Sequence, residues 1–589
     1  MLLCFFHRAW VRRVRLLPGT SSRFKVAFLS AAFLLGNAFG QSRPDEPKNK
    51  IRGIVLNAAT QAPVPRALVY SADNRYAMLT DGEGQFEFTL PKEEPEKALP
   101  QSGETFYGSV VPPAFARQGD RLLVRARKPG FLDDVGRRMG TWASTGEQTT
   151  ISLMPEGLIK GRVSLSTGDS AAGIGVQLFA KKVQDGQSRW IPQEGERTNS
   201  LGEFRFSGLE GGAYRLVTNE MMDNDPVTAV PGGPQFGFPP VYFPASADFA
   251  GASTIQLTAG QSVEVDLSLT RQPYFPVRIP VASGDAAGMN VSVEGARGPG
   301  YSLGYNPAAH RIEGLLPSGS FTVTATTYGA GASTGTVRIA VSGAPSDGPT
   351  MTLAKNNSIR LDVKEEFNKP DAGDSGTWSD GKHTYALHGA RLHLQVRVES
   401  ADDLENFSGG ALRPPTGPND DSLILDDVPP GRYWLRLSAS RGYVASATAG
   451  GVDLLREPLL VGSGSAEPIE IKMRDDVAEI EGTVTPVTTR NNLETDPETG
   501  SRIPHAWVYC IPQTEGAGQF QQFPVYGDGK FGGNGMAPGS YLVVAFASEQ
   551  SDLAYRDPEV LKRYEFKGQV VHLVAGQTTT VQVQVASSE

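Results

Sequence analysis

Residues 79–88 read Leu-Thr-Asp-Gly-Glu-Gly-Gln-Phe-Glu-Phe, and this stretch decides the fold of the region around it. Its Asp-x-x-Gly sequence predicts a tight turn in which Gly84 supplies a residue that tolerates positive φ. Phe86 and Phe88 then follow with one residue between them, so a strand places both rings on the same face. Two aromatic rings on one face indicate a buried sheet surface. The stretch therefore predicts a β-sandwich core.

The same signature recurs along the chain. Residues 198–206 read Thr-Asn-Ser-Leu-Gly-Glu-Phe-Arg-Phe, and residues 528–531 read Asp-Gly-Lys-Phe. A later strand, led by an aromatic residue just after a glycine, also recurs, at Gly212-Ala-Tyr214, Pro317-Ser-Gly319-Ser-Phe321, Pro430-Gly431-Arg-Tyr433 and Pro538-Gly539-Ser-Tyr541. Such self-similarity indicates an internal repeat of one small structural unit.

Closing and opening strands mark the borders of these units. Residues 255–269 and 571–585 both contain a strand, an Ala-Gly-Gln turn and a second strand with alternating apolar residues. Each closing strand is followed within a few residues by an opening strand, and the opening strands begin at Ile51, Leu158, Tyr274, Ile359 and Ala478. In three of the openers a glycine stands two residues before a valine.

These borders predict five domains, called modules 1–5 below. They span residues 41–156, 157–272, 273–357, 358–476 and 477–589. The short linkers favour a semi-rigid rod over freely jointed modules. We therefore expect an all-β protein, a tandem array of about five Ig-like or transthyretin-like β-sandwich domains after a signal peptide.

Length and composition agree with this expectation. A chain of 589 residues is too long for one core, and at about 150 residues per domain it holds roughly four domains. Its 67 Gly and 42 Pro exceed ordinary usage but stay below the level that signals disorder. With 39% hydrophobic residues the chain can still bury cores, so the extra Gly and Pro indicate many turns between short strands.

Residues 1–40 predict a secretory signal peptide. They contain six basic and no acidic residues, an apolar run at 26–35, and the small-x-small ending Ala38-Phe39-Gly40. The run is shorter than the roughly 20 residues of a membrane span. We expect cleavage near Gly40/Gln41 and a secreted or periplasmic protein that is not an integral membrane protein.

The charge and the cysteine content limit the kinds of binding partner and the disulfides that the chain can have. Without residues 1–40 the chain keeps 49 basic against 64 acidic residues, a formal charge near −15. Such a chain repels phosphate backbones, so we expect no nucleic-acid partner. Only Cys4 and Cys510 occur, and Cys4 leaves with the signal peptide. No intramolecular disulfide remains, and each module must be held by its own core.

The repeated residues carry a resemblance. The Gly-x-Val opener, the Thr-Asp-x-x-Gly-x-Phe-x-Phe stretch at 80–88 and the final Pro-Gly-x-Tyr resemble the carboxypeptidase regulatory-like domain. The resemblance is clear in modules 1, 2 and 5, partial in module 4 and weak in module 3. It implies a transthyretin-like β-sandwich of the carbohydrate-binding-like fold group, related to Cna protein B-type repeats. The shared residues are turns and core, so they identify a fold rather than a function.

No catalytic, metal or cofactor site is predicted. Zinc carboxypeptidases hold their metal with His-x-x-Glu plus a distant His, and the one such pair here is His310 and Glu313. A strand would point these two side chains to opposite faces, which excludes a shared metal. His383, His388 and His393 are spaced by five, and we expect surface histidines.

Two further chemical interpretations are set aside. Cys510 lies in an apolar strand and is expected to be a buried small hydrophobe rather than a nucleophile. Asp81-Gly-Glu83 and Asp420-Asp421 supply too few oxygens for calcium, so turn chemistry explains the first and a solvated loop the second. We therefore expect a protein that is not an enzyme and has no cofactor.

Sugar binding relies on exposed aromatic faces that stack on pyranose rings. Trp142, Trp190 and Trp378 lie in polar stretches that we take for loops, and Tyr242 lies in a Pro-rich aromatic loop. These four are the candidate carbohydrate-binding residues. Packing of the same rings over a sandwich edge is the alternative.

The sequence thus favours a non-enzymatic exported binding or spacer protein of the cell envelope, with carbohydrate as the leading ligand class. One alternative is a structural or protein-interaction module, such as an accessory partner of an outer-membrane receptor. The second alternative is an enzyme with a site assembled between modules.

Overall fold

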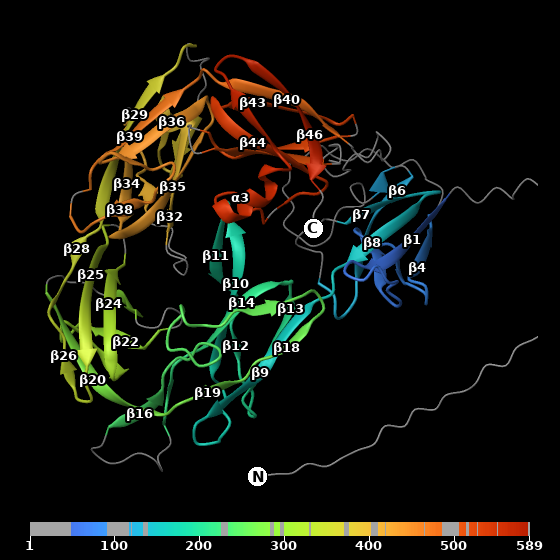
Figure 1. Cartoon of the computed structure of the whole chain (residues 1–589). Coiled ribbons are helices and arrows are strands. Elements are labelled where there is room, and N and C mark those ends of the chain that lie inside the picture. Colours follow the sequence, from blue (N-terminus) through green and yellow to red (C-terminus); the bar gives the residue numbers. More distant parts are fainter. Residues whose placement is uncertain are drawn as a thin grey trace, which may run out of the picture. The chain divides into compact units, whose positions relative to one another are not determined.

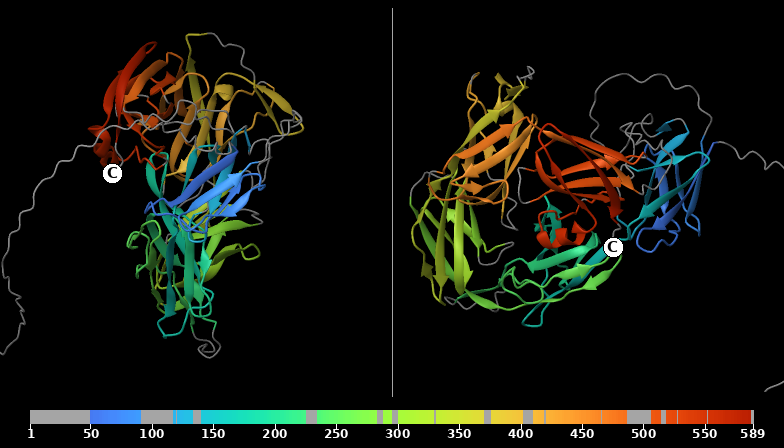
Figure 2. Two further views of the ribbon diagram at one scale, coloured as in Figure 1. Left: turned by 90° about the vertical axis from the view of Figure 1, so that its right-hand side faces the viewer. Right: turned by 45° about the horizontal axis from the view of Figure 1, so that its top comes forward.

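The structure is a computed structural model of the 589-residue chain, and Figure 1 shows its course. It describes residues 49–90, 117–118, 120–132, 140–224, 234–282, 288–294, 300–328, 331–369, 376–401, 410–418, 420–464, 466–485, 506–513, 518–526, 528–550 and 552–586. The expected signal peptide lies outside these residues. Figure 2 shows from two further directions that the described chain consists almost wholly of strands, as the turn-rich composition predicts.

Module 1 contains two sheets around a core that includes Phe86 and Phe88. Its strands are β1 (Lys50–Asn57), β2 (Leu68–Ser71), β3 (Ala77–Leu79), β4 (Gln85–Thr89), β5 (Arg117–Gln118), β6 (Arg121–Arg127), β7 (Thr141–Ser144) and β8 (Gln148–Leu153). One sheet has the order β4-β1-β8, and the other has the order β3-β2-β6-β5 with β7 also paired to β6. The Asp81–Gly84 turn precedes β4, and Gly84 has φ +73°.

Module 2 repeats this arrangement. Its strands are β9 (Gly157–Leu165), β10 (Gly175–Gln184), β11 (Gln187–Pro192), β12 (Glu196–Arg197), β13 (Glu203–Leu209), β14 (Gly212–Thr218), β15 (Met221–Met222), β16 (Gln235–Phe238), β17 (Ile255–Leu257), β18 (Ser262–Glu264) and β19 (Leu267–Leu269). One sheet has the order β13-β9-β18 with β19 also on β9, and the other has the order β11-β10-β14-β17 with β12 on β10.

Module 3 shares a sheet with the end of module 2. Its strands are β20 (Gln272–Ala282), β21 (Met289–Glu294), β22 (Leu303–Asn306), β23 (Arg311–Pro317), β24 (Gly319–Thr327), β25 (Ser333–Val341), β26 (Ser346–Asp347), β27 (Met351–Thr352) and β28 (Ala354–Lys355). One sheet has the order β15-β16-β20-β23-β22 with β26 and β27 on β20, and the other has the order β21-β24-β25-β28. Strands β15 and β16 thus precede the module in sequence but join its sheet.

Module 4 has two main sheets and a separate hairpin. Its elements are β29 (Asn357–Glu366), β30 (Gly376–Ser379), β31 (Thr384–Leu387), α2 (Ala390–His393), β32 (Leu394–Ser400), β33 (Ala411–Leu412), β34 (Leu423–Val428), β35 (Gly431–Ala439), β36 (Tyr443–Ala449), β37 (Val452–Asp453), β38 (Leu459–Val461) and β39 (Ile469–Arg474). The sheets have the orders β33-β34-β29-β39-β36-β37 and β32-β35-β38, and β30 pairs with β31 alone.

Module 5 is built on one continuous sheet. Its elements are β40 (Ala478–Thr485), β41 (Ala506–Pro512), β42 (Gln521–Val525), β43 (Lys530–Met536), β44 (Gly539–Phe546), α3 (Pro558–Glu565), β45 (Gln569–Leu573) and β46 (Thr578–Ala586). The sheet order is β42-β41-β44-β46-β40-β43, with β45 also on β44. Among the residues that the structure describes, no helix is long and apolar enough to cross a membrane.

All five modules share one topological feature. The opening strand of each module pairs in parallel with its closing strand, although about 70–110 residues separate the paired positions. The parallel pairs are β1 with β8, β9 with β18 and β19, β20 with β26 and β27, β29 with β39, and β40 with β46. Modules 3 and 4, where the sequence signature is weak or partial, keep this pairing. The structure is therefore a tandem array of β-sandwich modules.

A glycine in the opening strand pairs directly with a phenylalanine in modules 1, 2 and 5. The three cross-strand pairs are Gly53–Phe86, Gly161–Phe204 and Gly482–Phe531. In each pair the ring lies across the glycine, so that a Cβ on Gly161 would be 2.9 Å from Cζ of Phe204 and one on Gly482 2.7 Å from Cε1 of Phe531. The glycine that recurs two residues before a valine thus makes room for the core ring.

A tyrosine hydrogen bond recurs at the turn before the late strand. Tyr214 Oη donates to the Glu210 carbonyl at 2.7 Å, Tyr433 Oη to the Pro429 carbonyl at 3.1 Å, and Tyr541 Oη to the Ala537 carbonyl at 2.8 Å. Each acceptor lies four residues before its tyrosine. Burial raises the pKa of Tyr214 to about 12, which keeps this donor protonated. The aromatic residue of the Gly-x-Tyr sequence therefore fills the core and also satisfies a turn carbonyl.

The glycine–phenylalanine pair gives a stability prediction. In Gly161→Ala the added methyl group overlaps the Val265 carbonyl oxygen of the closing strand and crowds Phe204, so both neighbouring strands must move. We expect a loss of about 2–4 kcal/mol in the local stability of module 2, seen as faster hydrogen exchange in β9 and β13.

Gly304→Ala is the matched control, because this strand glycine has nothing within 4 Å of its Cβ position. We expect its local stability to change by less than about 1 kcal/mol. Equal exchange in the two variants would contradict the role assigned to Gly161.

Candidate functional site

The hairpin β30–β31 of module 4 carries a row of aromatic rings outside the sandwich core. Trp378 in β30 and Tyr385 in β31 are directly opposite each other. Both are partly exposed, and among the described residues neither belongs to the side chains that form the module's core. His383 lies two residues before Tyr385 and is exposed, so its ring points to the same side of the hairpin.

The three rings are parallel. The planes of Trp378 and Tyr385 differ by 7° and those of His383 and Tyr385 by 4°, and both centroid distances are 6.1 Å. Fully overlapping rings come closer, as Phe520 and Tyr555 do at 3.9 Å and 5°. The rings of the hairpin therefore overlap only in part, and portions of their faces are not covered by each other.

The loop of the hairpin is fixed by Asp380. Its Oδ1 accepts hydrogen bonds from the backbone N–H of Lys382 at 2.7 Å and of His383 at 2.6 Å, and its Oδ2 lies 3.2 Å from His383 Nδ1. These hydrogen bonds, from the His383 and Lys382 backbone first, lower the pKa of Asp380 to about 2. The loop is therefore capped by a carboxylate at neutral pH, and the same carboxylate contacts the imidazole of the row.

This geometry suits an apolar, flat ligand surface flanked by polar groups. The C–H face of a pyranose ring has that character. Parallel aromatic rings that are only partly covered can contact such a face at several adjoining points. The exposed side chains of Asp380 and Lys382 lie in the same loop and can hydrogen-bond hydroxyl groups. We call Trp378, Tyr385 and His383 the aromatic row.

Trp142 and Trp190 lie on strands, which corrects their expected placement in loops. Trp142 is in β7 and packs against the buried Ala72 and Leu123. Trp190 is in β11, where the Arg215 guanidinium lies 4.7 Å from its ring centroid and Phe249 meets it at 5.8 Å. Trp378, the third predicted loop residue, is also on a strand. Both Trp142 and Trp190 are partly exposed but are engaged by their own modules.

Tyr242 is not a surface residue. Its side chain is 0% exposed and meets Phe249 at 5.9 Å in an edge-to-face contact. The Pro-rich segment therefore packs its ring inward, and Tyr242 offers no face to a sugar in this structure. This burial differs from the exposed aromatic loop on which its selection as a carbohydrate-binding candidate rests.

Sequence reasoning missed Tyr385 and considered His383 only as a metal ligand. A signal was present, because Trp378 and Tyr385 are equally far from the centre of the Asp-Gly-Lys-His loop. Such symmetry predicts a cross-strand pair once the hairpin is recognised. The sequence signal of the hairpin itself is weak because its strands have only four residues each.

The structure also places the residues of the metal hypotheses. Among the described residues, no group of three or more His, Cys, Asp or Glu side chains is placed to hold a metal ion. His310 is in a turn with φ +46°, outside β23, whereas Glu313 is in β23 and pairs with Arg311 at 2.5 Å. Glu313 is therefore engaged in an ion pair, and the pair of residues is split between a turn and a strand.

The three spaced histidines have different environments. His383 belongs to the aromatic row, and His388 Nδ1 lies 3.6 Å from Asp421 on the surface. His393 is 2% exposed, at the end of α2, with Nδ1 3.4 Å from Ser440 Oγ. The expectation of surface histidines is therefore wrong for His393, which is buried at the junction of α2 and β32.

The acidic stretches are explained by turns. Asp81 Oδ1 accepts from the Glu83 and Gln85 backbone N–H groups at 3.1 and 2.7 Å, which confirms turn chemistry. Asp420 accepts from the backbone N–H and hydroxyl groups of Thr416 and Ser422, which hold its pKa well below the usual range, the Ser422 hydroxyl contributing most.

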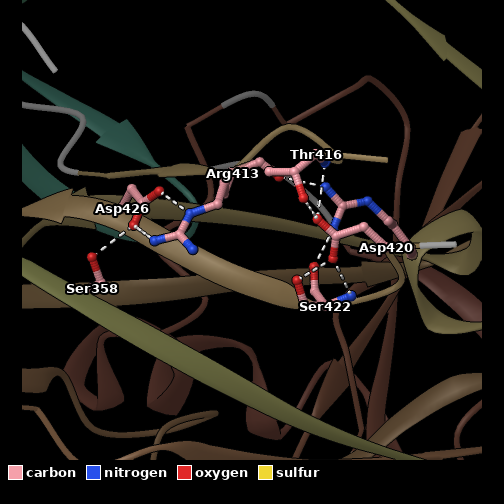
Figure 3. A network of polar contacts seen from close by, with 7 residues as sticks. Ser358, Arg413, Thr416, Asp420, Ser422 and Asp426 are labelled. Carbon is pink, nitrogen blue, oxygen red and sulfur yellow. Dashed lines mark hydrogen bonds and ion pairs between the residues drawn. The ribbon is translucent and has the colours of Figure 1, made fainter. Parts of the chain in front are cut away.

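Figure 3 shows this Asp420 network beside a second one. Arg413 contacts both carboxylate oxygens of Asp426, at 2.5 and 2.8 Å, and Ser358 Oγ donates to Asp426 Oδ1 at 2.7 Å. Asp426 of β34 thus links Arg413 to Ser358 of β29, whereas Asp420 joins Thr416 and Ser422 within their own segment.

Cys510 is 0% exposed in β41 and belongs to the core of module 5, which confirms the expected buried thiol. Burial raises the pKa of this thiol from 9.0 to about 12. The thiolate that a nucleophile requires is therefore scarce at neutral pH.

Comparisons with known proteins give distant structural likeness only. No protein-family model and no curated protein matches the chain. Among solved structures, the minor pilin GBS52 of Streptococcus agalactiae aligns with 38% of this chain and 97% of its own, at 14% identity and a TM-score of 0.17.

A Streptococcal ancillary pilin covers 51% of this chain and 99% of its own, at 11% identity and a TM-score of 0.17. The major pilin subunit BcpA of Bacillus cereus covers 73% of this chain and 99% of its own, at 10% identity and a TM-score of 0.12. TM-scores this low establish neither fold nor function for this chain. The resemblance to the carboxypeptidase regulatory-like domain stays a prediction.

The burial of Cys510 gives a reactivity prediction. At pH 8, raising a thiol pKa from 9.0 to about 12 lowers the thiolate fraction about a thousandfold. We expect iodoacetamide to leave Cys510 unmodified in the folded chain and to modify it fully in denaturant, as measured by peptide mass spectrometry. A Ser207→Cys variant, with its new thiol on an exposed position of β13, is the control that reacts in the folded state. Rapid folded-state modification of Cys510 would contradict this assignment.

Proposed function

We propose that the chain is an exported, non-enzymatic binding protein of the cell envelope that binds carbohydrate through the aromatic row of module 4. One observation carries this proposal: Trp378, Tyr385 and His383 hold parallel rings on one side of a hairpin that takes no part in the main sheets. The export and envelope parts of the proposal rest on the sequence of residues 1–40.

Three features support a ligand-binding rather than a packing role for the row. The core of module 4 is formed by aliphatic residues and Tyr433 from both main sheets, without the two strand rings. His383 is exposed, and Trp378 and Tyr385 retain partial exposure. Large partly exposed rings with fixed orientation lose little conformational freedom on binding, which is why aromatic residues are frequent in recognition sites.

The remaining modules fit a presenting role. The residues that recur between modules are turn glycines, core phenylalanines and the tyrosine that caps its own turn. The residues that recur hold each sandwich together and leave its surface free to vary. In this proposal the modules hold the aromatic row at a distance from the envelope.

Binding to a glycan array tests the proposal. We expect the full chain to bind a restricted set of glycans, and Trp378→Ala to weaken that binding by at least about tenfold, or 1.4 kcal/mol, because the largest ring of the row is lost. Since Trp378 also stabilises its hairpin, His383→Ala serves as a second variant that leaves the Trp378–Tyr385 pair intact. We expect it to weaken binding by about threefold, or 0.6 kcal/mol.

Tyr328→Ala is the matched control, because Tyr328 is a 73% exposed aromatic residue in module 3. Its removal should leave glycan affinity unchanged. Absence of glycan binding by the unmodified chain, or binding that survives both changes in the row, would overturn the proposal. Capture of an envelope protein in place of a glycan would favour the protein-interaction alternative.

A further inference from the structure

The hairpin β10–β11 is longer than the sheet to which it belongs. Strand β10 pairs with β14 only through Val176–Ala180, whereas its pairing with β11 continues to Gln184 and Gln187. Among the described strands, residues 181–184 therefore pair with β11 alone. The distal half of the hairpin extends beyond the sandwich of module 2.

The tip of this hairpin is a two-residue turn. Asp185 has φ +48° and Gly186 has φ +73°. Two consecutive residues with positive φ form the turn that best matches the twist of a hairpin, and Asp-Gly is a preferred sequence for it. The two turn residues alone thus determine the conformation of the tip. The turn places the Asp185 carboxylate next to the backbone of Gly186, which has no side chain.

The tip contacts module 4 by charge and hydrogen bond. Residues 49–589 form one compact unit, and within it Asp185 Oδ2 lies 2.9 Å from Arg436 Nε, which also contacts Glu399 Oε2 at 3.2 Å. Arg189 of β11 donates from Nη1 to the Ser400 carbonyl at 2.9 Å, across 211 residues of sequence. The Arg189 residue is only 9% exposed, so this carbonyl replaces solvent at a buried guanidinium.

The same tip contacts module 5. The backbone N–H of Arg556 donates to the Gly186 carbonyl at 2.9 Å. The glycine also faces the ring of Tyr555, since a Cβ at position 186 would be 2.5 Å from its Cε1 atom. Tyr555 is itself held by its stacking on Phe520. The absence of a side chain at Gly186 is therefore needed both for the turn and for the contact.

Arg556 joins the two receiving modules. Its guanidinium lies 5.9 Å from the ring centroid of Trp434 in β35, the strand that also carries Arg436. Arg556 thus contacts module 2 through its backbone and module 4 through its side chain. Module 2 therefore meets modules 4 and 5 at one place, although neither of them adjoins module 2 in the sequence.

We propose that the hairpin β10–β11 is a clasp that holds module 2 against modules 4 and 5. A row of modules joined only by short linkers makes no such contact, so the clasp replaces the rod expected from linker length. Its closure depends on the fit of Gly186 against Tyr555 and on the Asp185–Arg436 ion pair. Asp185 is 45% exposed at its side chain, so salt weakens this part of the clasp.

Fluorescence energy transfer between modules 2 and 4 tests the clasp. The full chain carries dyes on Ser207→Cys and Lys472→Cys, two exposed strand positions, together with Cys4→Ser; Cys510 is buried. We expect one narrow distance distribution for this chain. In Gly186→Ala the new methyl group collides with Tyr555, and we expect the distribution to move to longer distances, with the closed population falling about tenfold or more.

Gly173→Ala is the matched control, because Gly173 also has φ +73° in module 2 but has nothing within 4 Å of its Cβ position. It introduces the same backbone strain without the collision, and its closed population should equal that of the parent chain. Asp185→Asn keeps a residue that suits the turn and removes only the charge. We expect its closed population to fall about two- to fivefold at low salt, and the difference from the parent to shrink at high salt.

Three results would overturn the clasp. They are a broad distance distribution in the parent chain, an unchanged distribution in Gly186→Ala, and an equal change in Gly173→Ala. Hydrogen exchange in β9 and β13, measured on each variant, shows that module 2 remains folded and separates loss of the clasp from loss of the module.

Discussion

The contact between one glycine and one aromatic ring constrains most of this structure. In modules 1, 2 and 5 the opening strand lies between the strand that carries the phenylalanine and the parallel closing strand. At Gly161 the ring of Phe204 crosses one side and the Val265 carbonyl approaches the other, so no side chain fits. A larger residue would displace both neighbours at once, and close packing leaves no space for them to move into. The turn, the core ring and the closure of the module are thus coupled at one position.

This constraint explains how well the sequence predicts the fold and where the signature weakens. The Asp-x-x-Gly turn, the alternating strands and the Gly-x-Val opener are local patterns, and each appears in the structure where the sequence places it. In module 4 the opening strand pairs Leu361 with Leu423 instead of glycine with phenylalanine. An aliphatic pair preserves the same parallel closure without the recognisable motif. The parallel pairing of opening and closing strands therefore occurs in more modules than the glycine–phenylalanine motif does.

The candidate site was less predictable because aromatic exposure depends on tertiary packing. Tyr242 stands in a stretch that looks like a surface loop, but Phe249 and the other residues of a small cluster bury its ring. Trp378 was identified, yet its partner Tyr385 becomes significant only when the hairpin register brings the two side by side. The Asp185–Gly186 turn is readable from two residues, whereas its contact with Arg436 joins positions far apart in the sequence. The sequence shows which side chains could form a site, whereas the tertiary structure determines which of them come into contact.

The two segments that carry the proposals are both hairpins that extend beyond the repeated sandwich. An isolated two-stranded hairpin is marginally stable in water, so each needs stabilising contacts besides its own backbone pairing. The distal part of β10–β11 obtains them from modules 4 and 5. The hairpin β30–β31 obtains them from cross-strand rings and a carboxylate-capped loop, and these rings stay partly open to solvent. The repeated core fixes the fold, and departures from the repeat provide the surfaces that differ from one module to the next. A ligand that covers the open rings would add the contacts that a neighbouring sheet supplies elsewhere.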